Sequence, residues 1–305
     1  MNGMQTANTT EKVDTGSWKE SFRIADLKSP LLVPICLNFV VLLWLYLPTF
    51  HWWSVEWMKE DSYYQHAPLI PFISLFVVWL KRKQLLALPV KPWPAGYFLV
   101  VPGILIAVMM TWAGAKEVQG LVFPIILTGM IMVLFGQQIV RELRFPLAYL
   151  YFMVVLPGDV LAKLSFKIQL LSTIGAVGFL KLIGFDVNRV GVKIELPSVD
   201  VLVGGPCSGF RLLISLFALT ILFVYLAEGR KFSKSMLVIL MFPFSIVLNA
   251  IRITMIALVG EKWGYETMQS FHDYSGYIML LLAFALLWAL AGVFKCRRLN
   301  SMLTP

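Results

Sequence analysis

The sequence predicts an all-α polytopic membrane protein with about eight transmembrane helices. Of its 305 residues, 59% are hydrophobic and only 14% are charged, whereas soluble domains carry about 25% charged residues. The hydrophobic residues also collect in runs close to the ~20 residues that a helix needs to cross the hydrocarbon of a bilayer. Composition and run length therefore both indicate that most of the chain is solvated by lipid.

The apolar runs place the helices in order along the chain. We expect spans near residues 31–49, 66–80, 96–114, 118–135, 146–162, 207–226, 236–259 and 273–294. The second span is short, and its Pro68 and Pro71 fall in the first turns of the helix. A missing N–H group costs little at that position, so neither proline argues against the span.

Residues 163–206 interrupt this series. Lysines and glycines punctuate residues 163–185, which favours an interfacial or re-entrant helix over a clean span. In residues 186–206, Val and Ile alternate with polar residues and turn formers, which predicts a small extracytoplasmic β segment before the sixth span. Such a segment offers a surface against which an extended substrate peptide can pair.

The chain is expected to form one transmembrane domain over residues 31–294, because no linker, low-complexity run or internal repeat interrupts it. Residues 1–30 and 295–305 are expected to be cytoplasmic tails. The first tail mixes acidic and basic residues and lacks the apolar core and cleavage site of a signal peptide. We therefore expect the first span to act as the insertion signal.

Basic residues predict the orientation. If the N terminus lies inside and residues 163–185 do not cross, the basic loops at 81–91, 141–144 and 230–234 are all cytoplasmic, as the positive-inside rule requires. A crossing by residues 163–185 would instead export the loop at 230–234 and the basic C-terminal tail. We therefore expect the chain to lie in the inner membrane of a prokaryote, with both termini in the cytoplasm and residues 186–206 outside.

Charge and cysteine content exclude several functions. Lys and Arg outnumber Asp and Glu by 26 to 17, but in a membrane protein this excess reports cytoplasmic loops, so we expect no nucleic-acid partner. Cys36, Cys207 and Cys296 are far apart and form no CxxC pair, which indicates neither a disulfide framework nor a zinc site. We expect no metal and no cofactor, so any cysteine chemistry must use a single thiol.

Three reactive residue types collect at one membrane level under this topology. Cys207 lies at the outer start of the sixth span, Arg252 below the outer end of the seventh, and His272 just before the eighth. Acyl transfer needs an activated thiolate, a group that protonates the leaving amine, and donors for the developing oxyanion. A thiol, an imidazole and a guanidinium supply those roles.

The cysteine differs from the other two in its surroundings. Cys207 lies in GGPCSGFR, where glycines and a proline end a loop and the thiol sits near a helix N terminus, whose dipole favours a thiolate. A lone cysteine in an apolar helix is usually an inert small side chain, and we expect Cys36 and Cys296 to be of that kind. Ser208 and Arg211 follow on the same helical face as Cys207.

The charged and imidazole residues each have a plain structural alternative. Arg211 and Arg252 in apolar segments cost about 3 kcal/mol each on insertion scales, so they are functional or paired unless they snorkel to the headgroups. His272 is either catalytic or a solvated interfacial residue, and the adjacent Asp273 either orients its ring or adds surface charge. His66 is a second candidate base at the outer face, or an interfacial residue beside two tyrosines.

These segments together resemble the exosortase/archaeosortase family of membrane proteins. The resemblance rests on GPCSGFR around Cys207, NAIRIT around Arg252, FHDYSGY around His272 and the early HAPLIPFISLFVVWLKR, which cover residues 60–294 in order. It implies a multi-pass cysteine protease-transpeptidase in which Cys207 matches the nucleophile, Arg252 the catalytic arginine and His272 the catalytic histidine. Supporting roles go to Arg211, Ser208, Asn249, Asp273 and His66.

The resemblance also implies partners. The expected substrates are exported proteins with a C-terminal sorting signal, made of a short Pro-Glu-Pro-like motif, a transmembrane helix and a basic tail. A membrane-embedded amine or water would accept the cleaved product, and the activity would serve surface sorting and extracellular polysaccharide production. The lipid bilayer is the other partner.

Three other functions fit parts of the sequence. A transporter would bind an anion at Arg211 and Arg252, but it favours inverted repeats, and the sequence contains none that we detect. A scaffold for polysaccharide export would use its Arg and His residues only to pair helices. An acyltransferase would share the Cys and His, and its natural substrate would distinguish it.

Overall fold

The computed structural model describes residues 22–23, 29–59, 62–204 and 208–296. These residues are mainly helical, and six of the helices are long and apolar enough to cross a membrane, with two shorter apolar helices beside them. The prediction of an all-α polytopic membrane protein is confirmed. Cys207 lies outside the described residues.

The helices and strands are labelled in chain order. The helices are α1 (Ser29–Met58), α2 (Leu69–Leu80), α3 (Arg82–Ala87), η2 (Pro94–Gly96), α4 (Tyr97–Trp112), α5 (Lys116–Phe135), α6 (Gln137–Tyr149), η3 (Leu150–Met153), α7 (Gly158–Leu182), α8 (Phe210–Leu226), α9 (Lys231–Trp263) and α10 (Tyr265–Val293). The strands are β1 (Phe22–Arg23), β2 (Pro89–Val90), β3 (Asn188–Val190), β4 (Lys193–Glu195) and β5 (Asp200–Leu202). Strand β1 pairs antiparallel with β2.

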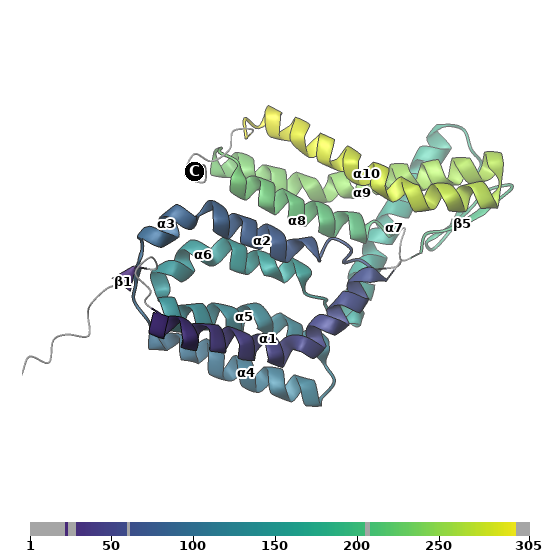
Figure 1. Ribbon diagram of the computed structural model, residues 1–305. Helices are drawn as coiled ribbons and strands as arrows, with labels where there is room; N and C mark the ends of the chain where they lie inside the picture. The colour runs from purple at the N-terminus through teal and green to yellow at the C-terminus, as the bar shows by residue number, and fades with distance from the viewer. Residues whose placement is uncertain (1–21, 24–28, 60–61, 205–207, 297–305) are drawn as a thin grey trace, which may run out of the picture.

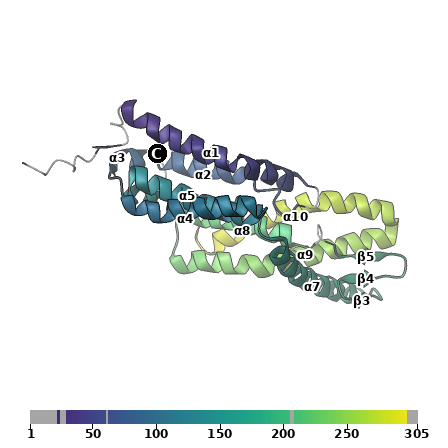
Figure 2. The same cartoon turned by 90° about the horizontal axis from the view of Figure 1, so that it is seen from below.

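The long helices run back and forth along one direction, and α7 lies across them (Figure 1). The start of α1, α3 and the end of α10 lie at one end of the bundle, and the starts of α2 and α8 lie at the other. We call the latter the site end. Figure 2 shows α9 and α10 reaching past the bundle there, with β3, β4 and β5 beside them.

One predicted span is wrong. Residues 146–162 do not form one helix, because α6 ends at Tyr149, the 3-10 helix η3 ends at Met153, and Val154 is extended. Pro157 then precedes the first residue of α7, and a proline disfavours helical backbone in the residue before it. The other predicted spans correspond to α1, α2, α4, α5, α8, α9 and α10.

Helix α7 contains most of the ambiguous stretch 163–185. It is one unbroken helix of 25 residues, so the broken course of a re-entrant segment is not what forms. Its length and composition would allow a crossing, yet in Figure 1 it lies across the site end of the bundle. Lysine side chains spaced along such a helix reach water while its apolar face packs below.

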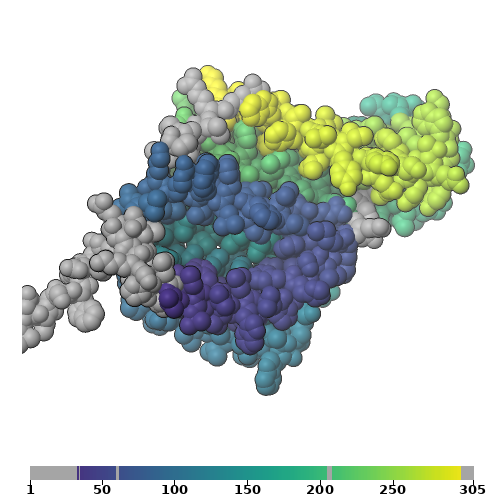
Figure 3. Space-filling model, viewed as in Figure 1, coloured from purple at the N-terminus to yellow at the C-terminus, as the bar shows by residue number. Residues whose placement is uncertain are grey.

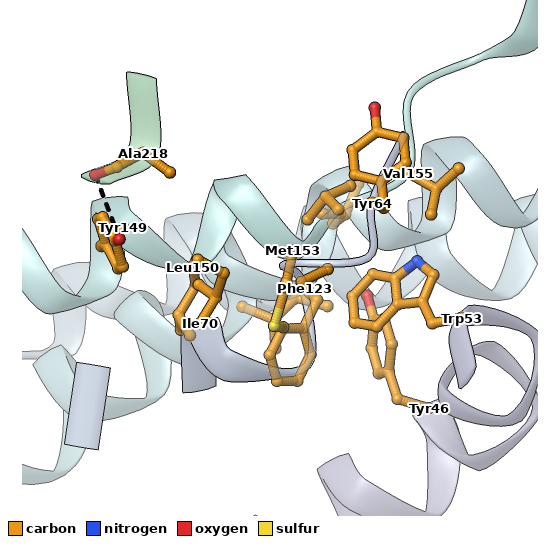
Figure 4. Close-up of a cluster of buried hydrophobic side chains, with 14 of the residues drawn as sticks. Tyr46, Trp53, Tyr64, Ile70, Phe123, Tyr149, Leu150, Met153, Val155 and Ala218 are labelled. Carbon is orange, nitrogen blue, oxygen red and sulfur yellow. Dashed lines mark hydrogen bonds between the residues drawn. The ribbon is translucent and has the colours of Figure 1, made fainter. Parts of the chain in front are cut away.

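The core of the first half of the chain is aromatic (Figure 4). The rings of Tyr46 and Phe123 meet edge to face with centroids 5.0 Å apart, and Trp53 is completely buried beside them. A Cβ atom at Gly120 would lie 2.7 Å from the Trp53 ring, so glycine permits this close approach of α1 and α5. The hydroxyl of Tyr149 donates to the carbonyl oxygen of Ala218, which ties η3 and α6 to α8.

The outer surface of the bundle is apolar. Figure 3 shows the face formed by α1, α2 and α10. Large side chains stand out from each of these helices, with Trp44 72% exposed, Phe72 71% and Leu281 72%. Apolar area of this extent on several helices is unfavourable in water and suits contact with lipid.

The predicted β segment exists as a small antiparallel sheet in the order β3-β4-β5. Ile194 and Val201 are opposite each other in the register and are buried in a cluster that also includes residues of α7 and α9. On the exposed side, Lys193 contacts Asp200 at 2.7 Å and Glu195 at 3.1 Å. Hydrogen bonds to Asp200 and then to Glu195 raise the pKa of the Lys193 ammonium.

Candidate active site

The chain that follows Cys207 turns sharply into α8. Ser208 is completely buried, and its hydroxyl oxygen accepts a hydrogen bond from the backbone N–H of Phe210 at 3.1 Å. This bond satisfies one of the N–H groups that a helix start leaves without an intrahelical partner. Gly209 has a φ of +75°, a left-handed conformation that glycine adopts at little cost.

Gly209 also brings this turn against α9. A Cβ atom at this position would lie 2.6 Å from Cγ of Asn249, closer than real Cβ atoms approach. Asn249 is completely buried. Asn249, which the sequence analysis gave a supporting role, therefore packs on the turn that immediately follows Cys207 in the chain.

Arg252 lies one turn further along α9, and its side chain reaches α10. It is 8% exposed. Its Nε donates to Oγ of Ser275 at 2.9 Å, and its Nη2 donates to the carbonyl oxygen of His272 at 3.1 Å. The structure therefore brings Arg252 and His272 together, through the main chain of His272.

His272 lies inside α10, whereas the sequence analysis placed it just before the eighth span. The reason is that α10 begins at Tyr265, because Gly264, with a φ of +85°, ends α9 in a tight turn. The imidazole Nδ1 lies 3.2 Å from Oδ1 of Asp273. The Asp273 side chain is 64% exposed, so solvent weakens this pairing and it contributes little to the stability of the fold.

Residues just before α2 contact another side of α8. Nη1 of Arg211 donates to Oε1 of Gln65 at 3.2 Å. Nδ1 of His66 lies 3.2 Å from Oγ of Ser215. The two hydrogen bonds thus join Gln65 and His66, which precede α2, to α8.

Sequence reasoning missed Ser275, Ser215 and Gln65. Ser275 follows His272 by one helical turn in the FHDYSGY motif, and Ser215 follows Arg211 by one turn. That spacing places each serine on the face of the charged or imidazole residue, and it was the available signal. Gln65 precedes His66 directly, but only the fold reveals that it contacts α8.

The field at this site favours negative charge. The N terminus of α8 carries the positive end of the helix dipole. Arg211 lies in the first turn of α8, and Arg252 lies one turn along α9 from Asn249, which packs on Gly209. Over the described part of the chain, no three His, Cys, Asp or Glu side chains gather as metal ligands would. The arrangement is suited to stabilising an anion, such as an oxyanion or a carboxylate.

Fold and site together define a multi-pass membrane protein with a polar site of Arg, His, Asn and Ser residues at one end of its helical bundle. The chain belongs to the transmembrane exosortase family (Exosortase_EpsH), which matches residues 52–289. This match confirms the family that the sequence motifs indicated. Comparison with curated proteins and with solved structures gives no match to the chain.

Proposed function

We propose that this exosortase is a cysteine protease-transpeptidase that cleaves C-terminal sorting signals of exported proteins. The observation that most supports this is the contact between Gly209 and Asn249. It joins the turn after Cys207 to the face of α9 that bears Arg252, and Arg252 in turn contacts the backbone of His272. Three motifs that are far apart in the sequence are therefore linked by a continuous series of contacts.

Cys207 acts as the nucleophile. Its thiolate attacks the carbonyl carbon of the scissile peptide bond, and a C–S bond forms as the carbonyl electrons move to the oxygen. His272 accepts the thiol proton and returns it to the nitrogen of the departing amine as the C–N bond breaks. The product is a thioester between Cys207 and the new C-terminal carboxyl group of the substrate.

Arg252 stabilises the negative charge of this step. It is buried among α9 and α10 residues, where a guanidinium interacts with an oxyanion more strongly than it would in water. Asp273 orients the imidazole of His272, while Ser208 and Asn249 support the turn that carries the nucleophile. Arg211 and His66 line the approach from the α1–α2 turn.

The second half of the reaction regenerates the thiol. An amine held in the membrane, or water, attacks the thioester carbonyl while His272 takes a proton from this nucleophile, and the sulfur leaves as a thiolate that receives the proton from His272. Attack by an amine yields a new amide bond and therefore transfer, whereas attack by water yields hydrolysis. The basic loops support an orientation in which this site faces outward from the inner membrane.

A reporter experiment tests the proposal. An exported domain is fused to a Pro-Glu-Pro-like motif, a transmembrane helix and a basic tail, and is co-expressed with the full chain. We expect wild type and Cys36→Ala to shorten the reporter, and Cys207→Ala to leave it full-length at equal membrane abundance. Equal shortening by Cys207→Ala would reject the cysteine mechanism.

A further inference from the structure

We propose that Ser275 is a positioning residue that fixes the guanidinium of Arg252 for the reaction. This inference rests on the proposed function, because it assigns the consequence of the contact to catalysis. The contact itself joins two buried side chains from different helices. Ser275 is 1% exposed and Arg252 is 8% exposed.

The contact is a closed triangle of hydrogen bonds. The hydroxyl of Ser275 accepts from Nε of Arg252 at 2.9 Å and donates to the carbonyl oxygen of His272 at 2.8 Å. The same carbonyl oxygen accepts from Nη2 of Arg252 at 3.1 Å. Each of the three groups therefore fixes the position of the other two.

This triangle sets the plane of the guanidinium. Arginine presents its donors in a rigid planar fork, so two bonds along the Nε–Nη2 edge determine the direction of the rest of the group. Two of its five N–H bonds point at acceptors on α10. Because the group is rigid, these two bonds also fix the directions of the other three. Without the serine hydroxyl, Nε loses the bond that fixes its end of this edge, and the plane of the group is less strictly determined.

On the side of Gly276, α10 presents no side chain to the guanidinium. The next residue on α10 is Gly276, and a Cβ atom there would lie 3.6 Å from Nη2 and 3.8 Å from Cζ of Arg252. The backbone of α10 thus approaches the group at ordinary contact distance without a side chain to confine it. Hydrogen bonding, more than steric confinement, holds the orientation on this side.

The chemical consequence concerns the transition state. A donor stabilises an oxyanion only when it points at the position where the charge develops, and a displacement of about 1 Å can cost on the order of a hundredfold in rate. Loss of Ser275 should therefore lower kcat more than it raises KM. Replacing a residue that only held α9 and α10 together would change abundance or stability, but it would not lower kcat selectively over KM.

The test compares purified variants acting on a sorting-signal substrate. We expect Ser275→Ala to lower kcat by about tenfold to a hundredfold with KM little changed, and Ser275→Thr, which keeps the hydroxyl, to recover most of that loss. Ser270→Ala is the matched control, because this serine lies on the same helix and bonds only the preceding turn, at the carbonyl of Glu266. It should cleave as wild type does.

A second pair of variants protects the test against misfolding. Threonine and valine have nearly the same shape, so Ser275→Thr and Ser275→Val should insert alike, and only the first retains the donor and acceptor. Equal kcat values for this pair, or wild-type kcat for Ser275→Ala, would overturn the positioning role. Failure of the proposed function looks different, because wild type would then not cleave the substrate in a Cys207-dependent way at all.

Discussion

Replacement of Gly209 by alanine should damage both stability and activity. An alanine at φ +75° pays about 1–2 kcal/mol for the left-handed backbone. Its Cβ would also lie 2.6 Å from Cγ of Asn249, and overpacking of this kind costs about 1–3 kcal/mol. The two effects together predict a loss of about 2–5 kcal/mol, a large share of the 5–15 kcal/mol that typically separates folded from unfolded proteins.

The assay is thermal unfolding in detergent together with cleavage of the sorting-signal reporter. Cleavage should fall more than stability alone explains, because the displaced turn directly follows Cys207. Gly178→Ala provides the matched control, since a Cβ there meets nothing within 4 Å and its site is a helix interior. Alanine should be neutral or stabilise α7 by up to about 1 kcal/mol.

The reasoning about the turn is refuted if Gly209→Ala unfolds at the wild-type temperature and cleaves at the wild-type rate. Such a result would mean that α8 can start in another way and that its contact with Asn249 is not required. A loss in Gly178→Ala equal to that in Gly209→Ala would instead show that alanine acts through general effects on insertion.

The remaining predictions concern single side chains at matched membrane abundance. Arg252→Lys should fail nearly as badly as Arg252→Ala, because lysine keeps the charge but loses the planar fork; restored cleavage would assign Arg252 to helix pairing alone. His272→Ala should abolish cleavage and His66→Ala should reduce it in part, and the reverse order would exchange their roles. Cys36→Ala and Cys296→Ala should cleave normally, because Cys36 lies near the start of α1 and Cys296 lies beside the α8–α9 turn, both away from the site end.

Much of the fold was predictable because lipid imposes a simple constraint. Each crossing helix must be long and apolar, so runs of hydrophobic residues reveal α1, α4, α5, α9 and α10. The error at residues 146–162 has a definite cause. Hydropathy continues from residue 146 to residue 162, although η3 ends at Met153 and α7 begins only at Gly158. The charged first turns of α6 made that helix, to which residues 146–149 belong, hard to recognise.

The candidate site was predictable to the extent that its residues are costly where they lie. Arg252 stands out because a buried guanidinium in an apolar segment needs a reason. Ser275 does not stand out, because a serine in a helix is ordinary, and its meaning depends on α9 and α10 packing side by side. The contact between Gly209 and Asn249 likewise joins residues on different helices, which local sequence patterns do not reveal.

A covalent intermediate on Cys207 tests the central claim most directly. The sorting-signal substrate is incubated with the purified full chain, the reaction is quenched with acid, and the protein is analysed by mass spectrometry. The account predicts an adduct on the peptide containing Cys207, with the mass of the upstream substrate fragment, that hydroxylamine removes and that Cys207→Ala does not form. Cleavage that proceeds at the wild-type rate in Cys207→Ala, with no adduct in either protein, would contradict it.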